Sequence, residues 1–414
     1  MMGAGVLSLP YVFGLVGLAF AVPGYLVVAA ICCFSVWRII QCEAILGDSR
    51  VLDPDTSTDE AMSKQDFGLG PLAQVAAHSL GLAGVVLAAF GIIVSQLGFC
   101  VAYVDIIITT LLEPNLSDKI PESVLRVGLG VVLCLLSSLR KLDSLAKISV
   151  LALAVYAYLL VILPIRWGTE ELTSGRAPSL GGVWGKFEPG NLGLWLGTSI
   201  FAQEAVVVSQ CVYQDMRLRD HRAFRPILVS SFVICSVAST ALAAFGCMCY
   251  GDSVKQVFYL NFPASSLDVT IAETILCLVL LPTFVIQLYP VARCFDELLT
   301  CAGYVSLSSD DSDETLEDSE EGRGQSCLVK VLARWLLVII TCVVAAVVPD
   351  LACISGYSGS FAMSVIGFFL PPLCHLKLHH FRVSTLDWIL DVGLLAVGVT
   401  ALVLGVSNTH CGAE

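Results

Sequence analysis

Stretches of about 20 apolar residues recur along this chain from its first residues to its last, and an α-helix of that length spans the roughly 30 Å hydrocarbon core of a bilayer. The chain is 57% hydrophobic and only 14% charged, so it carries more apolar surface than a water-soluble domain can bury. It lacks the alternating polar and apolar pattern of a membrane β-barrel, which leaves helices as the spanning elements. We therefore predict an all-α integral membrane protein.

We predict about eleven transmembrane helices in a single transporter-like domain covering residues 1–414. They lie near residues 1–18, 20–46, 84–112, 123–140, 145–166, 190–212, 225–250, 269–299, 328–348, 355–378 and 386–406. The first span is short, because the chain opens on the helix-breaking sequence MMGAGVLSLP. No basic residue precedes it, as a signal peptide would require. We expect this first span to be truncated at its N-terminal side.

Two connecting segments, residues 47–82 and 300–327, account for most of the net charge of −13, the second through the sequence LSSDDSDETLEDSEEGR. Such segments bury too little apolar area to offset the entropy of ordering, so both are predicted to be acidic loops. Most of the 22 Lys and Arg residues fall on the same side of the predicted bundle. The positive-inside rule makes that side cytoplasmic, together with the N-terminus. The sequon Asn115-Leu116-Ser117 then falls on the opposite side.

Several classes of function are disfavoured by missing motifs. No phosphate-binding G-x-x-x-x-G-K-[ST] and no G-x-S-x-G is present, so we predict neither an ATP-driven pump domain nor an enzyme. Most of the 17 cysteines lie in apolar windows, where a thiol behaves as a small hydrophobe. His375, His379 and His380 are predicted to lie at an interfacial helix end. We predict no metal site, no cofactor and no nucleic-acid partner.

Two predicted spans carry helix breaks in corresponding positions. The first begins with Gly3, Ala4 and Gly5 ahead of Val6, Leu7 and Ser8, and the sixth places Gly197, Thr198 and Ser199 ahead of Ile200, Phe201 and Glu204. Span six follows span one by five spans. This is the spacing expected of a five-plus-five inverted repeat, with an eleventh span left over. The alternative explanation is that these glycines allow close helix packing.

The chain resembles the amino acid/auxin permease family of the amino acid–polyamine–organocation superfamily along nearly its whole length. The stretches that carry the resemblance are GAGVLSLPYVFGLVG, VAYVDIII, SSLRKLDSLAKIS, TSIFAQEAVVVSQCVYQDM, YGDSVKQVFYLNFP, QLYPVARCFDELL, RWLLVIITCVVAAVVPDL and SGYSGSFAMSVIGFFLPPLCHL. The YGD-to-LNFP and QLYPV stretches are most similar to proton-assisted and vacuolar amino-acid transporters. After Glu204 the family pattern continues with Gly, and later with Pro and a second acid, whereas this chain has Ala205, Cys211 and Tyr213.

The resemblance implies a secondary active transporter of amino acids that works by alternating access around a site at the membrane midplane. With Gly3, Ala4 and Gly5 unwound, the amides of Val6, Leu7 and Ser8 would bind the substrate carboxylate at a half-helix N-terminus. Unwound carbonyls at Ser199, Ile200 and Phe201 would accept hydrogen bonds from the substrate ammonium. The alternative function is an amino-acid sensor that keeps the transporter fold without transporting.

Glu204 is the ionisable residue most suited to couple transport to protons, because an acid in mid-span costs about 2.5–3.5 kcal/mol on insertion scales. The alternative role for Glu204 is structural, as a cap on the broken helix. Asp105 in the third span is the second candidate. We predict H⁺ as the coupling ion, with Na⁺ remaining open. The predicted location is a vacuolar or lysosomal membrane or the plasma membrane.

Overall fold

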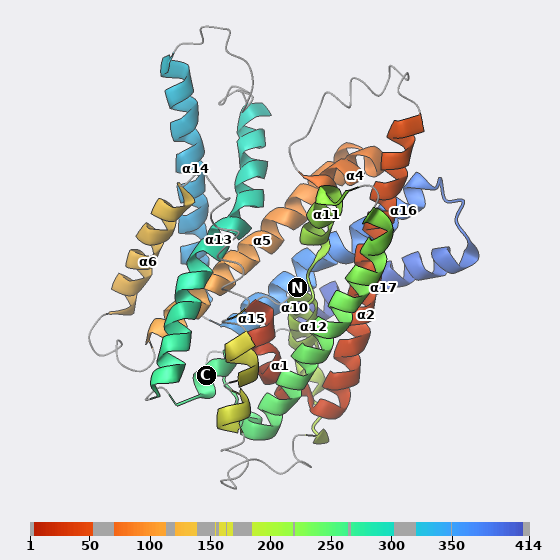
Figure 1. Ribbon diagram of the computed structural model, residues 1–414. Coiled ribbons are helices and arrows are strands. Elements are labelled where there is room, and N and C mark those ends of the chain that lie inside the picture. Colours follow the sequence, from red (N-terminus) through yellow and green to blue (C-terminus); the bar gives the residue numbers. More distant parts are fainter. Residues whose placement is uncertain are drawn as a thin grey trace.

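The computed structural model describes residues 4–52, 70–112, 121–138, 154, 157–162, 164–168, 184–217, 220–263, 266–301, 320–348 and 350–408, and within these residues it contains helices and no strand (Figure 1). The longer helices are α1 Leu9–Val16, α2 Leu18–Leu52, α4 Pro71–Leu80, α5 Leu82–Leu112, α6 Glu122–Ser137, α10 Leu192–Ala202, α11 Val206–Asp215, α12 His221–Tyr250, α13 Leu267–Cys301, α14 Glu320–Val347, α15 Leu351–Ser358, α16 Leu370–Leu378 and α17 Thr385–Asn408. Short 3₁₀ or π-helical segments are η1 Ala4–Ser8, η2 Tyr158–Ile162, η3 Pro164–Gly168, η4 Pro189–Asn191, η6 Gly251–Ser253, η7 Phe258–Asn261 and η8 Gly359–Phe369.

Helix α5 runs obliquely through the middle of the bundle (Figure 1). Helices α13 and α14 pack against it, and α6 packs against both of these. Helix α2 contacts α12 and α16. Between these groups α10 lies against α15, η8 and α17, so the broken sixth span is enclosed by other helices. This enclosure is what positions the candidate site inside the bundle.

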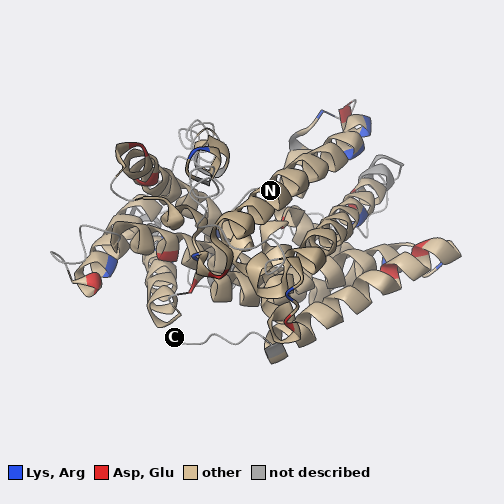
Figure 2. Ribbon diagram, turned by 90° about the horizontal axis from the view of Figure 1, so that it is seen from below, with Lys and Arg blue, Asp and Glu red and all other residues tan. Residues whose placement is uncertain are grey.

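Eight helices of the described residues are long and apolar enough to cross a membrane. They are Leu18–Leu46, Leu82–Leu112, Pro189–Gln214, His221–Ser253, Leu267–Phe295, Leu328–Val347, Leu351–Leu378 and Thr385–Ser407. Each matches one of the predicted spans, which confirms a multi-pass helical membrane protein. Most charged residues lie toward the helix ends, as Figure 2 shows.

Three predicted spans are not matched by a membrane-spanning helix among the described residues. The apolar helix at the start of the chain covers only Ala4–Val16. Helix α6 has 16 residues, short of the about 20 that span a bilayer upright. Much of the predicted span at 145–166 lies outside the described residues. The total of eleven spans and the inverted repeat therefore stay predictions.

The predicted loop boundaries need correction. Helix α2 continues to Leu52 and helix α13 to Cys301, while α14 begins at Glu320. Helix α4 also falls within the segment predicted as loop 47–82. It forms because PLAQVAAHSL has an apolar face, whose Leu72 and Val75 are buried in the core. The acidic stretches 53–69 and 302–319, and the sequon at Asn115, lie outside the described residues, so their membrane side stays a prediction.

The turn between α1 and α2 depends on Gly17. This residue has φ +80°, and its amide donates to the Phe13 carbonyl over 2.8 Å to end α1. The carbonyl of Lys186 occupies the space that a Cβ at this position would need. A glycine is therefore required both by the backbone conformation and by the close approach of the 184–191 segment.

Candidate functional site

The sixth span is interrupted at residues 203–205, between the end of α10 and the start of α11. The amide of Gln203 donates to the Ile200 carbonyl over 3.0 Å, which closes the last turn of α10. Ala205 then leaves the helical region, with φ −154° and ψ 3°. The predicted break is thus confirmed, but it lies beyond the position expected for it.

Ser199, Ile200 and Phe201 were expected to be unwound, and in the structure they belong to the last turn of α10. The expectation is wrong because the chain keeps helical hydrogen bonding as far as Ala202. The carbonyls of a last helical turn nevertheless lack the usual partners four residues later. Here the Ile200 and Phe201 carbonyls accept from the amides of Gln203 and Glu204 over 3.0 and 3.4 Å. Contact of Ser199, Ile200 and Phe201 with substrate stays a prediction.

The first span also differs from the expected unwound segment. Gly3 lies outside the described residues, and Ala4 and Gly5 open the buried 3₁₀ helix η1. The 3₁₀ geometry has a local cause, because Pro10 has no N–H to donate to the Val6 carbonyl in an α-helical pattern. The Ser8 hydroxyl instead donates to the Gly5 carbonyl over 3.1 Å. Val6, Leu7 and Ser8 consequently lie in η1, one turn before the α-helix begins.

Segment η1 of the first span and the end of α10 are in direct contact. A Cβ on Gly5 would lie 2.8 Å from Cδ1 of Phe201 and 3.0 Å from the Cα of Ala202. The Phe201 ring stacks on Phe99 of α5, with centroids 4.2 Å apart and planes inclined by 24°. Because not even a methyl group fits at Gly5, the described residues leave no space for an amino acid there. The structure therefore shows these predicted substrate-binding segments closed upon one another.

Glu204 lies at the break itself, with its carboxylate beside the backbone N–H groups of Val206 and Val207 at the start of α11. Its Oε1 atom is shielded from solvent and has no hydrogen-bond partner among the described residues. A cavity of about 20 Å³ adjoins Glu204 and is bordered on the α2 side by Cys32 and Ser35. That volume holds about one water molecule and no amino acid.

Asp105 is also buried, but on a different side of the bundle. Its nearest charges are Arg126 of α6, Asp350 and Glu122. Arg126 in turn bonds the Ala345 carbonyl of α14 over 3.0 Å. No interaction between Asp105 and Glu204 occurs among the described residues, so the structure does not bring the two predicted proton-coupling residues together.

The glycine of the sixth span that precedes the break has a packing role. A Cβ on Gly197 would collide with the Gly356 carbonyl and with the Ser360 hydroxyl of η8. The backbones of α10 and of the α15–η8 segment therefore touch at this crossing, as in other close helix pairs of membrane proteins. The packing explanation for the glycines is correct for Gly197, while the interruption itself lies at residues 203–205.

This arrangement, a 3₁₀ segment that meets an interrupted span inside a bundle of long apolar helices, can be compared with known proteins. Residues 1–410 match the family model described as "Transmembrane amino acid transporter protein". This chain belongs to that family. The transporter is 26% identical to amino acid transporter AVT3B of Arabidopsis thaliana, over 99% of this chain and 89% of that protein.

Two further relatives agree with the assignment. The transporter is 24% identical to amino acid transporter ANT1 of Arabidopsis thaliana, over 100% of this chain and 90% of that protein. It is 25% identical to sodium-coupled neutral amino acid transporter 7 of Xenopus laevis, over 68% of this chain and 60% of that protein. The resemblance to the amino acid/auxin permease family is confirmed, and the function of the chain is amino acid transport.

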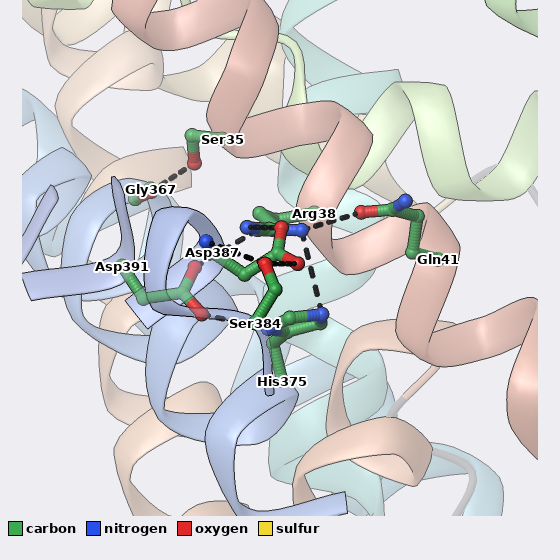
Figure 3. A network of polar contacts seen from close by, with 8 residues as sticks. All are labelled: Ser35, Arg38, Gln41, Gly367, His375, Ser384, Asp387 and Asp391. Carbon is green, nitrogen blue, oxygen red and sulfur yellow. Dashed lines mark hydrogen bonds and ion pairs between the residues drawn. The ribbon is translucent and has the colours of Figure 1, made fainter. Parts of the chain in front are cut away.

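The transporter contains a second buried polar site that the sequence prediction missed, drawn in Figure 3 and called here the Arg38 cluster: Arg38, His375, Asp387 and Asp391. Arg38 of α2 donates through Nε to Asp391 Oδ1 over 2.9 Å and through Nη2 to Asp387 Oδ1 over 2.7 Å. Nδ1 of His375 lies 2.7 Å from Asp391 Oδ2. The side chains of Arg38 and Asp391 are only 4% and 0% exposed.

Two of these residues had been interpreted differently from sequence. From sequence, Arg38 belongs to the Lys and Arg residues that indicate the cytoplasmic side, and His375 is grouped with His379 and His380 at a helix end. The predicted helix end is confirmed, because His375 lies in the last turn of α16, and the interfacial location stays a prediction. The side chain of His375 is buried, while His379 and His380 are exposed. The available signal was the occurrence of Arg38 and Asp391 inside apolar windows, because charges within spans pair with one another.

Proposed function

We propose that this transporter is a secondary active, proton-coupled carrier that alternates access to an amino acid site between η1 and the end of α10. In this proposal the amides at Val6, Leu7 and Ser8 bind the substrate carboxylate. The carbonyls of the last α10 turn accept from its ammonium group. A 3₁₀ segment and a helix C-terminal end offer partial charges of the two required signs.

The observation that carries the coupling proposal is the placement of Glu204. An acid inside a span, without a cationic partner among the described residues near it, is costly to keep ionised in a low-dielectric environment. Its unpartnered Oε1 and the adjoining water-sized cavity offer a route for one proton to arrive and leave. Protonation makes the Glu204 side chain neutral while the site switches from one side of the membrane to the other. Release of the proton to water on the opposite side then restores the carboxylate.

The closed contact between Gly5 and Phe201 fits one step of such a cycle. Substrate entry between η1 and α10 requires the Phe201 side chain to move out of that space. Its ring stacks on Phe99 of α5 in this structure, so the movement would break that contact. We propose that the structure corresponds to a closed conformation of this site. The cycle needs no enzymatic step, cofactor or nucleic acid.

Uptake into proteoliposomes tests the proposal. The purified chain is supplied with a panel of labelled amino acids, with an imposed pH gradient, with an imposed Na⁺ gradient, or with neither. Accumulation driven by the pH gradient alone is expected. Accumulation that requires Na⁺ would reassign the coupling ion, and binding without any uptake or exchange would favour the sensor.

The variant Glu204→Gln keeps the shape of the side chain and removes its charge change. It is expected to lose accumulation driven by the pH gradient and to keep exchange of substrate, because exchange needs only the loaded forms to interconvert. Asp105→Asn is the matched control, a second buried acid whose charged neighbours are different. Unchanged pH-driven accumulation in Glu204→Gln, together with its loss in Asp105→Asn, would transfer the coupling role to Asp105.

The finer location also belongs to the proposal. We place the N-terminus and the two acidic loops in the cytoplasm on the basis of the distribution of Lys and Arg. The membrane is vacuolar, lysosomal or plasma membrane, as the sequence resemblance implies.

A further inference from the structure

The Arg38 cluster joins three helices at one end of the bundle. Arg38 lies on α2, His375 on α16, and Asp387 and Asp391 near the start of α17 (Figure 3). The contacts that cross between these helices are polar and largely buried. Buried ion pairs are strongly destabilised when one partner is lost, so the strength of this junction depends on the charge state of its members.

The geometry assigns the protons of His375. A carboxylate only accepts hydrogen bonds, so the 2.7 Å contact between His375 Nδ1 and Asp391 Oδ2 places a proton on Nδ1. On the other side of the ring, Nε2 lies 3.4 Å from Nη1 of Arg38. A guanidinium only donates, so Nε2 faces it with a lone pair. The closed cluster therefore holds the neutral imidazole.

A second proton on His375 would disrupt this contact. It would set an N–H at Nε2 against the N–H groups at Nη1 of Arg38, and no acceptor among the described residues lies between these two atoms. Asp391 is already engaged by both residues, and the side chain of Asp387 is 39% exposed, so water screens its charge. The repulsion is relieved when α2 moves away from α16. Protonation of His375 and separation of these helices therefore favour one another.

The other titratable groups around His375 do not explain a separation of α2 from α16 in mild acid. They are Cys42 of α2, Cys374 and Lys377 of α16, His379 directly after α16, and His78 of α4, while η8 contributes none. His78 is exposed and contacts the Gln74 carbonyl. Partial burial, and then the neighbouring His375 and Arg38, lower the pKa of His379. His379 therefore stays neutral to more acidic pH than an ordinary histidine.

We propose that His375 is a second protonation site of this transporter, separate from Glu204, and that its protonation releases Arg38 and opens the junction of α2 with α16 and α17. The proton comes from water at the end of the bundle where Asp387 is exposed, binds Nε2, and returns to water when the junction closes. Mild acid thus shifts this end of the molecule toward its open form.

Two native thiols can report on the opening. Cys42 on α2 and Cys374 on α16 are both fully buried, and they lie close enough to interact electrostatically with each other and with the cluster. Closed packing protects both thiols from a membrane-permeant maleimide. Separation of α2 from α16 exposes them. No cysteine has to be introduced.

The experiment measures labelling of Cys42 and Cys374 by N-ethylmaleimide in the full chain reconstituted in nanodiscs, read by mass spectrometry. Labelling is compared at about pH 7.5 and about pH 5.5, within the range over which histidine side chains serve as pH switches. Each rate is divided by that of the same peptide in denatured protein at the same pH, which removes the chemistry of the thiol itself. The normalised rate is expected to rise by about tenfold at the lower pH, a factor that one proton can impose over this range.

Three variants separate the alternatives. His375→Gln keeps a donor toward Asp391 and an acceptor toward Arg38 without titrating, so its labelling is expected to stay slow at both pH values. His379→Gln and Glu204→Gln are expected to keep the acid response of the wild type. A wild-type rate that does not change with pH overturns the proposal, even if His375→Gln fails to fold. The proposal is also overturned if His375→Gln keeps the acid response while His379→Gln or Glu204→Gln loses it. Loss of the response in Glu204→Gln would leave the proposed coupling role of Glu204 intact.

Discussion

The guanidinium of Arg38 bonds the carboxylate of Asp391 over 2.9 Å, which joins helix α2 to helix α17 across 353 positions of sequence. Both side chains lie almost entirely within protein, in a bundle whose outer surface faces lipid. The pair therefore reports which faces of α2 and α17 meet.

Replacement of Arg38 by Ala is expected to destabilise the folded protein by about 3–5 kcal/mol, because it leaves Asp391 buried without its partner. The measurement is thermal unfolding of the purified protein in detergent. Arg166→Ala is the control, since its pair with Asp268 is exposed and such pairs contribute about 0–1 kcal/mol. The double variant Arg38→Ala, Asp391→Ala should be less destabilised than Arg38→Ala alone. Equal effects of Arg38→Ala and Arg166→Ala would contradict a buried junction.

Replacement of Gly5 by Val is expected to reduce amino acid uptake by about tenfold or more, because overpacking of a filled site costs about 1–3 kcal/mol. The added atoms would meet Phe201 and the backbone of Ala202. Gly128→Val is the matched control, because a Cβ at Gly128 of α6 meets nothing within 4 Å. Uptake is compared at equal amounts of protein in the membrane. Normal uptake by Gly5→Val would place the substrate away from η1.

The crossing of α10 and α15 should not tolerate even one extra methyl group. Gly197→Ala is expected to lower the yield of monodisperse protein, because its Cβ would collide with the Gly356 carbonyl and force the two helices apart. Gly393→Ala, on α17, adds the same group where nothing lies within 4 Å and should have little effect. The readout is size-exclusion chromatography after mild solubilisation. If both variants elute like the wild type, the helices can separate at Gly197 without cost.

The topology predicted from Lys and Arg can be tested with a protease site inserted at Ser312 in the acidic segment between α13 and α14. In sealed vesicles whose interior is cytoplasmic, cleavage is expected only after permeabilisation. A second site inserted at Asn115 is expected to be cleaved before permeabilisation. Cleavage of the Ser312 site in intact vesicles would reverse the proposed orientation.

The interruption of the sixth span could be predicted from the sequence only in part. Its existence and the presence of Glu204 at it could be inferred from residues 193–205 alone. Its position could not, because the helix persists to Ala202 and ends only where Ala205 adopts non-helical dihedral angles. The contact between Gly5 and Phe201 was likewise beyond local patterns, since it depends on how η1 packs on α10.

The order of residues along the chain is enough to identify a helical membrane protein and to locate most of its spans. The cost of placing a residue in lipid adds up along a segment, so a window of about 20 residues contains that information. The clustering of Arg38, His375 and Asp391 became visible only from the packing of the helices. Apolar surfaces gain no hydrophobic free energy by leaving lipid for one another, so an apolar pattern does not specify which helix faces meet. Shape complementarity and polar pairing between distant spans specify it instead.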